Sequence, residues 1–174
     1  MSFEFYEKAF AKSDKTDAIL VVDGKKLHVN KAILSYHSDY FDKLFNSAFR
    51  EKSMEEIEIK DVEFEDFATL LSLVHSAPIK PTKQNAENIL ELAERFLISC
   101  VKQYLECFLK QTNIDRLEKI RIGDKYQLDD LIQNGLNQYP SDWKISITEG
   151  TLAYKTISDK TKIKFLTHLL KLKE

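Results

Sequence analysis

The chain has 174 residues, which is enough for one compact domain with a small helical module appended to it. It is 43% hydrophobic and 31% charged with only 4 Gly and 3 Pro, a composition typical of a folded and largely helical protein. A formal net charge of -2 argues against nucleic acid as a partner, because sequence-independent binding needs a positive field.

The sequence also carries no sign of a membrane or secretory destination. The start lacks the basic and apolar regions of a signal peptide, and no apolar run approaches the roughly 20 residues that cross a bilayer. We therefore expect neither a membrane partner nor secretion, and place the protein in the cytoplasm, the nucleus or both.

The first predicted element is a short amphipathic helix within residues 1–16. Phe3, Tyr6 and Phe10 fall at helical spacing and give it an aromatic face. A single helix this short is not stable in water, so this face must pack either on its own domain or on a second chain.

A β-hairpin follows the arm. Residues 18–22 form a continuous apolar run of strand length, Asp23-Gly24 is a favoured type I′ turn pair, and residues 25–29 return as the second strand. Asn30 stands at the N-cap position of the next helix, where its side chain can accept a hydrogen bond from a backbone amide.

The rest of the chain is mainly helical, with one more strand where Glu56 to Ile59 alternate in polarity. Apolar periodicity predicts helices at residues 38–45, 64–74, 86–96, 101–109, 114–126, 128–139 and 162–172. The sequence therefore predicts an α+β fold in which a small three-strand sheet is covered by helices and followed by an all-helical extension.

Motifs for catalysis, cofactors or metals do not occur in the sequence. It contains no phosphate-binding loop, dinucleotide fingerprint, zinc-protease helix or nucleophile elbow, and its 4 His are scattered without metal-ligand spacing. Cys100 and Cys107 lie roughly 10 Å apart on one predicted helix, too far to bridge, and we interpret them as small buried residues. We expect a protein that is not an enzyme and holds no cofactor or metal.

One segment near the C-terminus, from Lys155 to Lys173, is locally basic. Such a charge run indicates either a solvated helix face or a surface for an acidic partner.

A series of motifs between Asp17 and Leu109 resembles the BTB/POZ domain, closest to the BTB halves of MATH-and-BTB proteins. The motifs occur in the family's order: Asp17-Ala18-Ile19-Leu20-Val21-Val22-Asp23-Gly24, Leu27-His28-Val29-Asn30-Lys31-Ala32-Ile33-Leu34-Ser35, Ser38-Asp39-Tyr40-Phe41, Leu44-Phe45, Ile57-Glu58-Ile59-Lys60-Asp61-Val62, and Phe67 to Ile79. The resemblance implies a BTB/POZ domain at residues 17–111, an N-terminal helical dimerisation arm at 1–16 and a helical BACK-like extension at 112–174.

This resemblance also implies a dimerising interaction module, paired with itself or with another BTB protein. The arm residues Phe3, Tyr6 and Phe10 would belong to the dimer interface, with Asp17 and Lys31 as the paired charges of the dimer cleft. The alternative for the arm is an intramolecular lid.

Many family members bind cullin-3 through a hydrophobic-x-Glu motif, and Phe49, Arg50 and Glu51 fall where it belongs. Packing of Phe49 into its own domain is the alternative. Two positions depart from the family pattern: Asn30 replaces a common His, and His75-Ser76-Ala77 replaces a common "Y-t-g" at a site that often touches the cullin.

By resemblance, then, the chain is an adaptor that recruits a cullin-3 ubiquitin ligase to an unidentified substrate protein. Because no MATH domain, Kelch repeat or zinc finger is recognisable, the helical extension or a BTB partner would have to capture that substrate. The alternative is an oligomerisation or corepressor scaffold that does not bind cullin.

Overall fold

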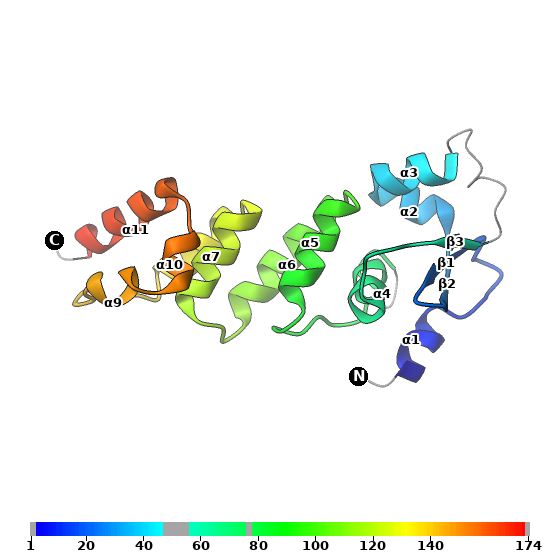
Figure 1. Cartoon of the computed structure of the whole chain (residues 1–174), viewed down its shortest axis with the longest axis horizontal. Coiled ribbons are helices and arrows are strands. Elements are labelled where there is room, and N and C mark those ends of the chain that lie inside the picture. Colours follow the sequence, from blue (N-terminus) through cyan, green and yellow to red (C-terminus); the bar gives the residue numbers. More distant parts are fainter. Residues whose placement is uncertain (1–2, 47–55, 76–77, 173–174) are drawn as a thin grey trace. The chain divides into compact units, whose positions relative to one another are not determined.

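The computed structural model describes residues 3–46, 56–75 and 78–172, with only the backbone described for Phe3 and Glu4. It divides into two compact units, residues 1–103 (unit 1) and residues 104–174 (unit 2). The division falls inside helix α6 (Ser99–Gln111). Figure 1 labels the elements of both units.

Unit 1 is built on a three-stranded sheet of β1 (Ala18–Val22), β2 (Lys25–Val29) and β3 (Glu56–Glu58) in the order β2-β1-β3. β1 and β2 pair antiparallel across a turn in which Asp23 and Gly24 both have positive φ, at 49° and 75°, as a type I′ hairpin requires. β3 pairs parallel to β1 with Leu20 opposite Ile57, which is possible because α-helical crossover residues separate the two strands.

Helices cover this sheet, as the sequence predicted. They are α1 (Phe3–Ala9), α2 (Lys31–His37), α3 (Asp39–Asn46), α4 (Phe64–Ser72), α5 (Ala86–Arg95) and the start of α6. In Figure 1, α2 and α3 lie above the strands and α1 below them. The core of the unit is aromatic: Phe96 stacks on Phe41 at 5.7 Å and contacts Phe67 at 5.0 Å, and all three rings are fully buried.

Polar caps fix where α2 and α3 begin. The Asn30 side chain accepts from the Ile33 amide at 2.9 Å, which confirms it as the N-cap of α2. Ser38 Oγ accepts from the Phe41 amide at 3.0 Å and donates to the Phe96 carbonyl at 2.6 Å, so the start of α3 is tied to the end of α5.

Unit 2 is entirely helical in the part that the structure describes. It holds α7 (Arg116–Tyr126), α8 (Asp129–Leu136), α9 (Ser146–Glu149), α10 (Leu152–Thr156) and α11 (Asp159–Lys171) besides the end of α6. The short helices α9 and α10 were not predicted. The core of the unit gathers residues from α7, α8, α10's end and α11: Ile120, Ile132, Leu136, Tyr139, Ile157, Phe165 and Leu169. No helix among the described residues is long and apolar enough to cross a membrane.

Candidate protein-interaction surfaces

The aromatic face of α1 is buried against its own unit. Tyr6 and Phe10 are only 2% and 3% exposed, and the Tyr6 hydroxyl lies 3.3 Å from Thr69 Oγ1 on α4. This burial supports the lid interpretation for these two rings in the single chain. The assignment of Tyr6 and Phe10 to a dimer interface stays a prediction, and the side chain of Phe3 lies outside the described residues.

Asp17 and Lys31, predicted as paired charges, are brought together at the start of α2. The Asp17 carboxylate accepts a hydrogen bond from the Lys31 backbone amide at 2.7 Å, which satisfies one of the amides at the helix start. The Lys31 ammonium lies over the Phe45 ring, 5.8 Å from its centroid. Asp17 and Lys31 therefore both contribute to the start of α2. Their role in a dimer cleft stays a prediction.

The exposed apolar side chains of unit 1 are different from those predicted. On α2, Leu34 is buried, whereas Ile33 is 38% and Tyr36 85% exposed on another face of the helix. Phe5 on α1 is 50% exposed beside the buried Tyr6. Large apolar side chains at exposed positions of a rigid, capped helix are typical of interaction surfaces.

The predicted cullin-binding residues are only partly described. Phe49, Arg50 and Glu51 lie outside the described residues. His75 follows α4 and is half-buried, with its ring edge-on to Phe10 at 5.8 Å and its Nε2 buried without a hydrogen-bond partner among the described residues. Burial lowers the pKa of His75, and the nearby His37 lowers it further, so the imidazole is neutral at pH 7.

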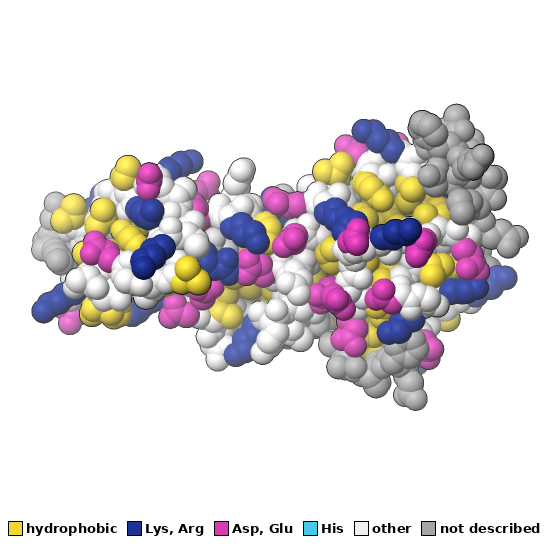
Figure 2. All heavy atoms as spheres, viewed as in Figure 1, with side chains coloured by type: hydrophobic (Ala, Val, Ile, Leu, Met, Phe, Trp, Pro, Cys, Tyr) yellow, Lys and Arg dark blue, Asp and Glu magenta, His cyan; other side chains and the backbone are white. Residues whose placement is uncertain are grey.

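In unit 2, most of the locally basic segment forms α11. Figure 2 shows basic and hydrophobic side chains beside one another over the part of the chain that carries α11, at the left. Lys162 pairs with Asp159 at 3.1 Å and Lys164 with Asp129 on α8 at 2.7 Å. Other lysines of the helix, Lys160 and Lys171, are exposed.

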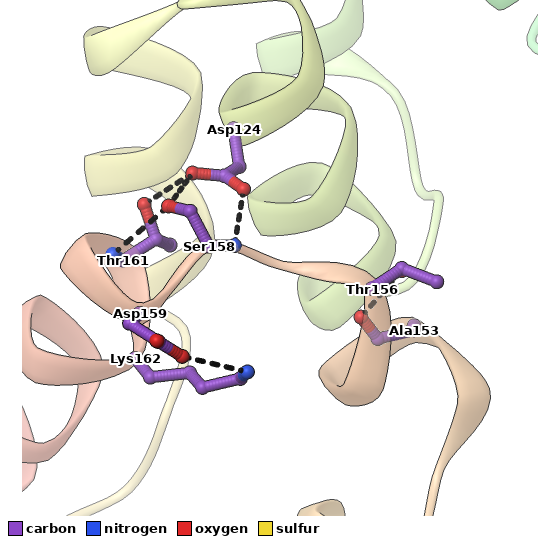
Figure 3. A network of polar contacts seen from close by, with 7 residues as sticks. All are labelled: Asp124, Ala153, Thr156, Ser158, Asp159, Thr161 and Lys162. Atoms are coloured by element: carbon purple, nitrogen blue, oxygen red, sulfur yellow. Dashed lines mark hydrogen bonds and ion pairs between the residues drawn. The ribbon is translucent and has the colours of Figure 1, made fainter.

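A carboxylate on α7 holds the start of α11 in place (Figure 3). Asp124 accepts from the Ser158 amide at 2.6 Å, the Ser158 hydroxyl at 2.6 Å and the Thr161 hydroxyl at 2.5 Å. Burial alone would raise the pKa of Asp124, but the hydrogen bonds from Ser158 and Thr161 outweigh it and hold this pKa below its ordinary value. The orientation of α11 in unit 2 is therefore fixed by ionised Asp124 as well as by its apolar face.

The family model of the BTB/POZ domain matches residues 6–113, which is more than half of the chain. The chain belongs to the BTB/POZ family. A BTB/POZ domain-containing protein of Caenorhabditis elegans is 34% identical over 168 residues, covering 95% of this chain and 53% of that protein. BTB and MATH domain-containing protein 36 of the same nematode is 30% identical over 166 residues, covering 94% of this chain and 51% of that protein.

Against solved structures, the chain is similar to the BTB domain of human gigaxonin, with 22% identity and a TM-score of 0.47, covering 60% of this chain and 90% of that chain. The chain spans about half the length of the two nematode proteins that it matches. The BTB/POZ domain is a protein-interaction fold that is generally non-enzymatic and supports dimerisation with other BTB proteins.

Within this BTB/POZ domain, one prediction about individual residues was wrong. Cys100 and Cys107 are both exposed free thiols rather than buried apolar residues, because each lies on a part of α6 that faces solvent. Cys100 Sγ lies 3.6 Å from His37 Nδ1. No group of three or more His, Cys, Asp or Glu is placed to hold a metal within the described ranges.

Sequence reasoning missed the exposed pair Ile33 and Tyr36, although a signal for it was present. Leu34 lies about 100° around α2 from Ile33 and about 160° from Tyr36, so all three side chains cannot pack on the unit at once. The family model matches residues 6–113, and the two compact units divide after Gln103. The domain boundaries at residues 16 and 111 stay a prediction.

Proposed function

We propose that this chain is a dimerising BTB adaptor that recruits a cullin-3 ubiquitin ligase to a substrate protein. The observation that carries the proposal is the exposed face of α2, with Ile33 and Tyr36, on a domain of the BTB/POZ family. The partner across this face is a second copy or another BTB protein.

The α2 face suits an interface because the helix is rigid before binding. Asn30 caps it through the Ile33 amide, and Asp17 binds the Lys31 amide, so its first turn is held by two side chains. A preorganised surface loses little conformational entropy on association. An aromatic residue as exposed as Tyr36 can then bury a large area at low entropic cost.

The cullin contact in this proposal uses Phe49 as an apolar anchor and Glu51 as an acceptor of charge-assisted hydrogen bonds. His75 would contribute a neutral ring, since burial lowers its pKa. Substrate would be captured by the helical residues after 112 or by a BTB partner with its own receptor domain.

A pull-down with the purified N-terminal domain of cullin-3, sized by light scattering, tests the proposal. We expect the parent chain to form a two-to-two complex and Glu51→Lys to lose binding by about 2 kcal/mol or more while remaining a folded dimer. Tyr36→Glu should instead give a monomer. Lys144→Glu, at an exposed position before α9 in unit 2, serves as the charge-changing control and should leave both properties unchanged.

The scaffold without cullin is the second candidate, and the departure at His75 favours it. Its ring is engaged with Phe10 of the same chain rather than presented to a partner. A well-folded dimer that does not bind the cullin domain would support the scaffold function and contradict the adaptor function.

A further inference from the structure

Helix α11 of unit 2 has two apolar faces, and only one of them packs on its own unit. Phe165 and Leu169 are buried in the core. On the neighbouring face Ile163 is 64%, Leu166 41% and Leu170 65% exposed. At about 100° per residue, these three side chains fall within roughly 60° of one another, so they form one continuous strip that we call the α11 stripe.

Lysines border the α11 stripe on both sides. The same helical geometry places Lys162 on one side and Lys160, Lys164 and Lys171 on the other. The segment 155–174 contains six lysines against two acidic residues, a net charge of +4 in a chain whose total is -2, so the remainder carries -6. Positive charge is thus concentrated in the segment that carries the α11 stripe.

A groove of about 610 Å³ runs beside the stripe between α8 and α11. Ile132, Leu136 and Ile163 give it an apolar floor, and Lys164, His168 and Lys171 line its α11 side. Its two carboxylates already have lysine partners within the unit, Asp129 with Lys164 at 2.7 Å and Asp130 with Lys110 at 3.3 Å. The groove therefore offers apolar contact next to cations rather than a site for a cation.

We propose that the α11 stripe and this groove are a docking site for an acidic amphipathic helix of a partner protein. Apolar residues at i, i+3 and i+7 of such a helix would cover Ile163, Leu166 and Leu170 and place one side chain in the groove. Carboxylates on one flank of that helix would meet Lys160 and Lys171, and those on the other flank would meet Lys162. A helix with basic flanks would meet like charges on both sides of the stripe.

The site is independent of the proposed dimer and cullin contacts, because those residues all belong to unit 1. Failure of one proposal therefore leaves the other standing. Asp124 keeps α11 in place through Ser158 and Thr161, which lie at the N-terminal end of the helix and away from the stripe. The stripe can consequently be altered without touching the contacts that orient the helix.

Fluorescence anisotropy with synthetic helical probes tests the inference on the full chain. The acidic probe carries Leu at i, i+3 and i+7 with Glu on both flanks; one matched probe replaces each Glu with Lys, and another replaces each Leu with Gln. The protein variants are Leu166→Gln with Leu170→Gln, and Lys160→Gln with Lys171→Gln, which removes two cations without placing a negative charge near Asp124. Leu152→Gln is the control, because Leu152 is 78% exposed on α10 outside the stripe. Thermal unfolding verifies that each variant is folded.

We expect the acidic probe to bind in preference to both matched probes, with affinity that falls as salt rises. Each double variant should weaken this binding by about tenfold or more, and Leu152→Gln should leave it unchanged. Equal binding of acidic and basic probes, or binding that survives both double variants, would overturn the proposal. So would self-association abolished by Leu166→Gln with Leu170→Gln, since the occupant would then be a second copy.

Discussion

Unit 1 closes its core with aromatic rings, whereas unit 2 places charged side chains inside or against its core. In unit 1, Phe41, Phe67 and Phe96 contact one another out of reach of solvent. In unit 2, Lys119 is 2% exposed and donates to the Lys110 carbonyl and to Asn134 Oδ1, both at 3.0 Å. Burial lowers the pKa of Lys119, so holding its charge there costs stability that the two hydrogen bonds must offset.

A second contact of unit 2, at the edge of its core, is also cationic. The Arg116 guanidinium lies 4.3 Å from the centroid of the Tyr139 ring and 4.2 Å from that of Trp143, and it donates to the Gln138 carbonyl at 2.9 Å. Desolvation by burial raises the pKa of Tyr139 to about 12 even beside this cation. Unit 1 therefore gathers its largest buried rings in one apolar cluster, while unit 2 adds to its apolar core cations that are held by individual polar and ring contacts.

The largest effect should come from removing a ring in unit 1. Phe96→Ala would delete the ring that contacts Tyr40, Phe41 and Phe67, and we expect a loss of about 3–5 kcal/mol in the free energy of unfolding. Hydrogen exchange of the β1 amides measures the stability of unit 1 separately from that of unit 2. Phe5→Ala is the matched control, because its ring is half exposed, and a loss as large as that of Phe96→Ala would contradict this account.

This difference between the units also decides what the sequence could predict. The sheet, its hairpin turn and the helices of unit 1 follow from apolar periodicity, a two-residue turn and the N-cap at Asn30, all of which are local signals. The family followed from the same region. In unit 2, the helices α7, α8 and α11 were predicted but α9 and α10 were not, because each is about one turn long and too short for a periodic pattern.

The candidate site was predicted less well than the fold. Periodicity identifies apolar faces but does not say which of two faces is buried, so Tyr6 and Phe10 were selected while Phe5, Ile33 and Tyr36 were missed. Long-range polar contacts such as that of Asp124 with Ser158 join residues 34 positions apart, and nothing local in the sequence indicates them.

A smaller effect is expected where α7 and α8 approach closely. A Cβ at Gly135 would lie 2.6 Å from the Arg116 carbonyl oxygen and 2.8 Å from Ile120 Cγ1, so Gly135→Ala must push the helices apart. We expect a loss of about 1–3 kcal/mol in unit 2, measured by hydrogen exchange of the α7 amides. Gly150→Ala is the control, since nothing lies within 4 Å of its Cβ and its φ of -76° suits alanine. If the two variants are equally stable, the close contact of α7 and α8 at Gly135 does not determine the stability of unit 2.

The smallest expected effect is the pH dependence of the Asp124 contact, which should change the stability of unit 2 alone. Because hydrogen bonds from Ser158 and Thr161 lower the pKa of folded Asp124, its ionised form stabilises unit 2 above the ordinary value of 3.8, and this contribution is lost as pH falls through the lowered folded pKa. Asp124→Asn keeps an acceptor but not the charge, so we expect it to cost about 1 kcal/mol at pH 7.

The gap in unfolding free energy between the parent and Asp124→Asn should therefore narrow as urea unfolding of the chain is repeated from pH 6 down to below the ordinary value of 3.8. Ser158→Ala removes one donor and should shrink the gap at every pH, because the remaining contacts favour the ionised carboxylate less strongly. A gap that stays constant across this range would mean that the Asp124 charge does not hold α11, and that the helix which carries the proposed docking stripe is oriented by its buried apolar face alone.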